Sequence, residues 1–105
     1  MTDDLELGGN IVLSGFSEID KGSMIIVKKL VGSSAKKFSE SCKDFQELKI
    51  TVKPIHHKES EPAKKFEIRV NLTAGGNNYT SDVTDNNLFV VLDKALKKVE
   101  HNLQK

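Results

Sequence analysis

Residues 85–105 read DNNLFVVLDKALKKVEHNLQK, and this stretch decides the fold because its apolar residues recur at helical spacing. An α-helix turns by about 100° per residue. On such a helix one continuous apolar stripe forms from Leu88, Val91, Leu92, Ala95, Leu96, Val99 and Leu103, with Phe89 at its edge. Residues 85–87 supply N-cap side chains, and the lysines gather toward the C-terminal end, where the helix dipole favours positive charge. The stretch therefore predicts a helix that buries one face and offers a basic face.

A second amphipathic helix is predicted from about Asp20 to about Cys42, with Ser17 or Asp20 as its N-cap. Its apolar stripe at i, i+3, i+4 spacing consists of Met24, Val27, Val31, Ala35, Phe38 and Cys42. Gly22 and Gly32 each weaken a helix by about 1 kcal/mol relative to alanine, so tertiary packing must hold this one. Ile25 lies among the lysines and is the one apolar residue that we expect to be exposed there.

Four strands are predicted at residues 10–16, 48–55, 65–72 and 79–83, with a turn at Gly75-Gly76-Asn77. Clean alternation places Lys49, Lys53, Lys65 and Arg69 on one face, so that face is wet and both helices cover the other. The predicted fold class is α+β, in the order β-α-β-β-β-α, with a four-stranded sheet and two helices packed on one face. Residues 10–105 then form a single domain, and residues 1–9 are a flexible N-terminal tail.

Composition excludes several classes of protein. The chain has 105 residues, 30% of them charged, and a net charge of only +1, so the total charge does not indicate a nucleic-acid binder. No apolar run approaches the roughly 20 residues that span a bilayer, and the acidic start MTDDLELGG does not resemble a signal peptide. The single cysteine, Cys42, cannot form an internal disulfide. These features lead us to expect a cytoplasmic protein with no membrane partner.

Catalytic and metal chemistry find little support in the residues. There is no nucleophile motif, glycine-rich phosphate loop or paired-carboxylate signature, so we expect no enzyme, no cofactor and no small-molecule substrate. Cys42 continues an apolar stripe and is interpreted as a buried structural thiol. His56 and His57, followed by Glu59 and Glu61, suggest a metal site at first. Adjacent residues of an extended segment point to opposite sides, however, so a polar loop without metal is the preferred interpretation.

The lysines of the two helices are the feature with a plausible function. If both apolar stripes face one sheet, both basic faces turn outward on the same side. They could then form one continuous basic surface, which suits a phosphate backbone. The six aromatic residues mostly occupy predicted core positions, so binding should depend on shape and backbone, as with folded RNA. The predicted RNA-binding residues are Lys21, Lys28, Lys29, Lys36, Lys43, Lys94, Lys97, Lys98, His101 and Lys105.

The terminal segment resembles the end of the ribosome hibernation factors, also called ribosome-associated inhibitors. The matching positions are Asn87, Leu88, Phe89, Val90, Val91, Leu92 and Asp93, followed by Lys98, Val99, Glu100 and Leu103. Asn87 stands where the family has an acidic residue. The element order and length also agree with the short forms of the family. The resemblance implies a basic surface that lies near the decoding site of the small ribosomal subunit, with Lys28, Lys29, Lys36, Lys94, Lys97 and Lys98 at the matching positions.

The sequence thus predicts a non-enzymatic RNA-binding module that docks on small-subunit ribosomal RNA and inhibits translation, as in ribosome hibernation under stress. We expect a monomer or a weak dimer. The alternative is a protein-interaction or self-associating structural domain of the same fold, which uses its sheet face or an edge strand.

Overall fold

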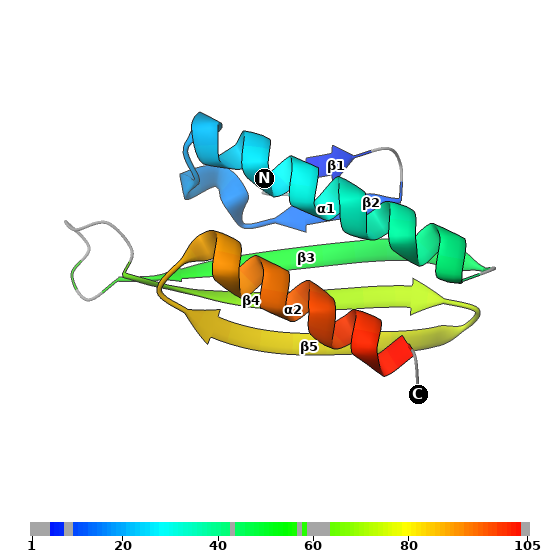
Figure 1. Cartoon of the computed structure of the whole chain (residues 1–105). Helices are drawn as coiled ribbons and strands as arrows, with labels where there is room; N and C mark the ends of the chain where they lie inside the picture. Colours follow the sequence, from blue (N-terminus) through cyan, green and yellow to red (C-terminus); the bar gives the residue numbers. More distant parts are fainter. Residues whose placement is uncertain (1–4, 8–9, 43, 57, 59–63, 104–105) are drawn as a thin grey trace.

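A five-stranded sheet with two helices on one face forms the structure, a computed structural model that describes residues 5–7, 10–42, 44–56, 58 and 64–103 (Figure 1). The strands are β1 (Leu5–Leu7), β2 (Ile11–Ser14), β3 (Phe45–Ile55), β4 (Lys65–Ala74) and β5 (Asn77–Asp85). The helices are α1 (Lys21–Ser41) and α2 (Leu88–Leu103), and a 3-10 turn, η1 (Phe16–Glu18), precedes α1. This arrangement confirms the predicted α+β class and the order β-α-β-β-β-α for the elements from β2 onward.

The strands lie in the order β1-β2-β3-β4-β5. β2 and β3 are parallel and are joined by α1, whereas the other neighbouring pairs are antiparallel. Gly75 and Gly76 form the predicted tight turn between β4 and β5, and both have positive φ, 57° and 78°. The two helices run side by side in the same direction (Figure 1). As a result, their basic residues belong to one layer of the molecule.

The short strand β1 extends the sheet beyond the four predicted strands. Leu5 pairs with Leu13, and Leu7 pairs with Ile11. The sequence pattern predicts no strand within residues 1–9, because three residues are too few to show alternation. Residues 1–4 and 8–9 of the predicted tail lie outside the described part of the chain.

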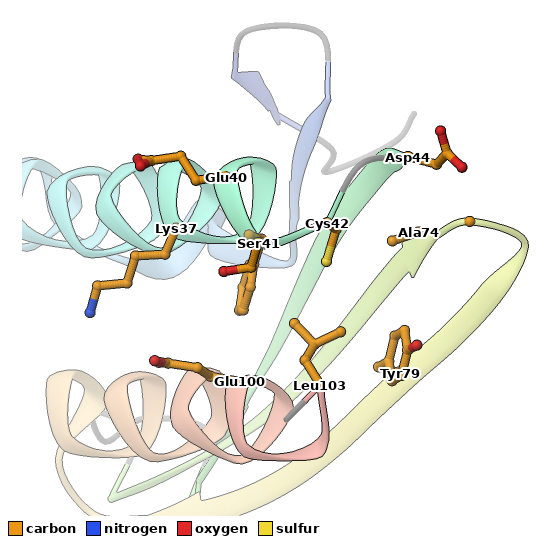
Figure 2. Close-up of a pocket in the computed structure, with 11 residues that line it drawn as sticks. Lys37, Glu40, Ser41, Cys42, Asp44, Ala74, Tyr79, Glu100 and Leu103 are labelled. Atoms are coloured by element: carbon orange, nitrogen blue, oxygen red, sulfur yellow. The ribbon is translucent and has the colours of Figure 1, made fainter. Parts of the chain in front are cut away.

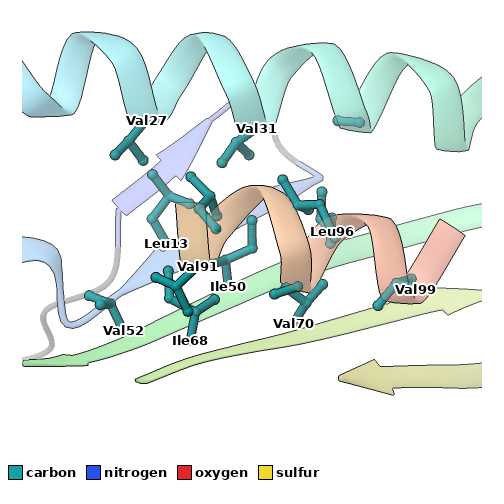
Figure 3. Close-up of a cluster of buried hydrophobic side chains, with 14 of the residues drawn as sticks. Leu13, Val27, Val31, Ile50, Val52, Ile68, Val70, Val91, Leu96 and Val99 are labelled. Carbon is teal, nitrogen blue, oxygen red and sulfur yellow. The ribbon is translucent and has the colours of Figure 1, made fainter. Parts of the chain in front are cut away.

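The core fills the space between the helices and the sheet (Figure 3). Both apolar stripes supply it as predicted, through Val27, Val31, Ala35 and Phe38 of α1 and Leu88, Val91, Leu92, Ala95, Leu96 and Val99 of α2. The prediction that Cys42 is a buried thiol is wrong. This residue is only half-buried, because it is the C-cap of α1, where the chain leaves the helix toward β3. Ile25 is 59% exposed, as predicted. Ile26 and Val90, which the pattern does not single out, are also exposed.

The sheet face away from the helices is polar, as the alternation predicts. Lys53, Lys65 and Arg69 are exposed, and Lys49 is half-buried. The Arg69 Nε donates a hydrogen bond to Asp82 Oδ1 on the neighbouring strand, at 2.8 Å. A carboxylate on the neighbouring strand therefore compensates the charge of Arg69.

The side chain of Ser81 on β5 makes a hydrogen bond to α2. Its hydroxyl is buried and donates a hydrogen bond of 2.7 Å to the backbone carbonyl of Ala95. We expect Ser81→Ala to lower the free energy of unfolding by about 1 kcal/mol, because a buried carbonyl loses its added donor. Urea denaturation measures this change. Ser33→Ala is the matched control, since Ser33 is exposed on α1 and alanine is the better helix former, so stability should not fall.

Carboxylates at the N-terminal ends of both helices make stability depend on pH. Asp20 accepts hydrogen bonds from the Ser23 hydroxyl at 2.7 Å and the Ser23 backbone N–H at 3.0 Å, which lower the pKa of its carboxyl. The backbone N–H of Asn86, followed by the Lys94 ammonium, lowers the pKa of Asp85. A carboxyl whose pKa is lower in the folded state than in the unfolded state stabilises the fold at pH values above its unfolded-state pKa. This stabilisation is lost as the pH falls through its folded-state pKa.

We therefore expect the urea midpoint to fall as the pH drops from about 5 toward about 2, and Asp20→Asn to make this fall shallower. Asparagine is an equally good N-cap, so the variant removes the titrating charge and keeps the cap. An unchanged pH dependence in Asp20→Asn would show that the Asp20 carboxyl contributes nothing to it.

Candidate nucleic-acid interface

Lysines of α1 form the first of two basic groups. The α1 group, as defined here, consists of the four predicted residues Lys21, Lys28, Lys29 and Lys36, all of which are exposed. None of them has an ion pair with another described residue. Glu40 is the single acidic residue within α1. The positive charge of this helix is therefore largely uncompensated along its own length.

The α2 group consists of Lys94, Lys97, Lys98 and His101, which are also exposed. Two of these residues have carboxylate partners: Lys94 Nζ lies 3.2 Å from Asp85 Oδ2, and Lys97 Nζ lies 3.1 Å from Asp93 Oδ2. All four line an open hollow of about 740 Å³ together with Thr80–Val83 of β5 and Asn102. The α2 group thus borders the outer strand of the sheet.

Acidic side chains separate the two groups. Glu100 lies on the side of α2 that faces α1, where it lines a hollow of about 480 Å³ with Lys37, Glu40 and Ser41 of α1 (Figure 2). Asp93 precedes Glu100 by two turns and is within about 20° of it on the helix surface. The structure therefore places the described members of the predicted set in one helical layer, but the expected continuous basic surface is wrong, because an acidic strip on α2 divides them into two groups.

The structure does not describe two of the predicted residues, and it shows one exposed lysine of the described helices that was not predicted. Lys43 and Lys105 lie outside the described residues. Lys37 is exposed and points into the space between the helices (Figure 2). It falls outside the predicted set because it lies on a different side of α1 from the α1 group. Its charge was visible in the sequence, but the direction from which α2 approaches was not.

The aromatic side chains leave little surface for base stacking. Phe16 and Phe38 are buried, and Phe45, Phe66, Phe89 and Tyr79 pack against the core while remaining partly accessible. This placement agrees with the predicted core positions. A nucleic acid bound to the helical layer would therefore contact mainly lysine side chains, through its phosphates and sugars.

The first residue of the histidine loop makes a polar contact with the 3-10 turn η1. His56 Nε2 lies 3.1 Å from Glu18 Oε2. Among the described residues, there is no group of three or more His, Cys, Asp or Glu side chains that could hold a metal ion. His57, Glu59 and Glu61, which the metal hypothesis requires, lie outside the described part of the chain. Neither described helix is long and apolar enough to cross a bilayer.

No protein-family model matches the chain, and no curated protein matches it either.

Proposed function

We propose that the chain is a non-enzymatic RNA-binding domain that docks its helical layer on folded RNA, and that its target is small-subunit ribosomal RNA, where it inhibits translation in the cytoplasm. The observation that carries the proposal is the α1 group. Four exposed lysines without ion pairs among the described residues lie along one helix that has a single acidic residue. Such a charge row releases counterions from a polyanion when it binds.

The small accessible area of the aromatic side chains favours folded RNA over single-stranded RNA as the target. Recognition of single-stranded RNA uses aromatic side chains on which bases stack. Here the aromatics belong to the core or pack against it. A rigid layer of two packed helices instead favours a target of fixed shape whose phosphates are already in position. The resemblance of residues 87–103 to ribosome hibernation factors supports the ribosome as the source of that shape.

Salt dependence of co-sedimentation with purified small ribosomal subunits tests the proposal. If each lysine of the α1 group neutralises one phosphate, the logarithm of the binding constant should fall against the logarithm of salt with a slope of about −3. Unstructured homopolymer RNA serves as the comparison and should bind more weakly at every salt concentration. Sedimentation that is absent at low salt, or that does not change with salt, would contradict the proposal.

A further inference from the structure

The outer edge of β5 is unpaired in the described part of the chain. β5 is last in the strand order, so no other described strand pairs with its outer edge. It runs for nine residues without proline, and its pairing with β4 is regular from Asn77 to Asp85. An edge of this kind offers backbone N–H and C=O groups to an incoming strand unless something covers it. In the described structure, the neighbours of this edge are the side chains of the α2 group.

The α2 group overhangs this edge with a spacing that matches a strand. Lys94 and Lys98 are four residues apart, which on a helix is a rise of about 6 Å. Alternate residues of a strand, which point to the same side, are about 6.7 Å apart. Because α2 runs antiparallel to β5 (Figure 1), successive helical turns follow the edge. An added strand would therefore bring every second side chain to the next basic residue of α2.

The hollow between the α2 group and Thr80–Val83 of β5 is called the α2–β5 groove, and its charges determine which side chains an added strand can carry. Lys98 and His101 have no acidic partner among the described residues, so they are available to carboxylates. On the other face of β5, Asp82 is exposed and is held by Arg69. A strand with acidic residues toward α2 and neutral residues toward Asp82 complements both sides. A nucleic acid is a continuous polyanion, so Asp82 would repel it, and it could not pair with the backbone groups of β5. The groove therefore favours a peptide over a nucleic acid.

We propose that the α2–β5 groove binds an extended acidic segment of a partner protein, which adds to β5 as a further strand and places carboxylates at alternate positions against Lys94, Lys98 and His101. Backbone hydrogen bonds supply affinity in this mode, and the alternate side chains supply specificity. Since the α2 group is also part of the helical layer, such a segment competes with RNA. Only this competition rests on the proposed function, whereas peptide binding does not.

Fluorescence anisotropy with the full chain and a labelled peptide of about seven residues, a usual strand length, tests the inference. The peptide alternates glutamate with threonine. Lys98→Glu should weaken its binding at least about tenfold, because a carboxylate then faces a carboxylate. Lys49→Glu is the matched control, since it makes the same charge change on the opposite sheet face and should leave the affinity unchanged. An equal loss in both variants would show attraction to net charge alone and would overturn the proposal.

Two N-methylated peptides distinguish strand addition from charge attraction. One is methylated at the odd amides and the other at the even amides, so both keep every carboxylate. Only alternate amides of an added strand point toward β5, and one peptide should therefore lose binding while the other keeps it. Equal binding of both would overturn the proposal.

A parallel titration with structured RNA completes the design. If the chain binds RNA through Lys98 but binds no peptide, the groove belongs to nucleic acid and the proposal fails. If the chain binds the alternating peptide but no RNA, the proposal stands and the proposed function fails.

Discussion

Gly15→Ala is expected to lower the free energy of unfolding by about 3 kcal/mol or more, a large share of the stability of a small domain. Gly15 has φ of +80°, a conformation that side chains rarely adopt. A Cβ at this position would lie 2.4 Å from the backbone carbonyl oxygen of Val52. Since that oxygen belongs to the central region of β3, it cannot move without distorting the sheet. Urea denaturation followed by circular dichroism measures the loss.

Gly32→Ala makes the same chemical change and should have the opposite effect. Gly32 is exposed within α1, and a Cβ there meets nothing within 4 Å. Alanine is the better helix former and also restricts the unfolded chain, so we expect a gain of about 0.5–1 kcal/mol. If both variants changed stability in the same direction, the close approach of Gly15 to Val52 would not be the cause of the loss.

Reversing three charges of the α1 group, in the variant Lys28→Glu, Lys29→Glu and Lys36→Glu, is expected to weaken binding to small ribosomal subunits on the order of a hundredfold at moderate salt. The reason is that these lysines have no ion pairs among the described residues, so their full charge is available to phosphates. The matching α2 variant, Lys94→Glu, Lys97→Glu and Lys98→Glu, should weaken binding by only about tenfold. Asp85 and Asp93 already offset two of its three lysines.

A third variant separates location from total charge. Lys49→Glu, Lys58→Glu and Lys65→Glu change the net charge by the same amount at positions outside the helical layer. Filter binding of all three variants, each first checked for folding by circular dichroism, gives the comparison. Equal losses in all of them would mean that RNA responds to net charge and that the helical layer is not the site.

The helices and the sheet were predictable because each has a periodic pattern that one buried face imposes. Asp20 as N-cap, the apolar stripe of α2 and the turn at Gly75-Gly76 are all local signals, and the structure confirms them. The strand β1 was not predictable, because its three residues are too few to show alternation, although its partner β2 follows it directly in the chain. The half-buried position of Cys42 likewise depends on how the chain leaves α1.

The arrangement of the lysines was only partly predictable. A helical wheel gives the side of each helix that is basic but not the rotation of one helix relative to the other. The structure shows that the α2 group lies toward β5 and that Glu100 lies toward α1. The ion pair of Lys94 with Asp85 joins residues on successive elements and depends on the turn between them. Such relations arise from tertiary packing, and no pattern within a single helix encodes them.

The parallel pairing of β2 with β3 has a consequence for the order of folding. Ile11 pairs with Leu48, and the whole of α1 lies between them in the chain, so this pairing must close a long loop. By contrast, β3, β4, β5 and α2 follow one another and make contacts between near neighbours. We therefore expect the C-terminal half to form the nucleus and the N-terminal half to join it late. The lysine row of α1 would then become ordered only at the final stage of folding.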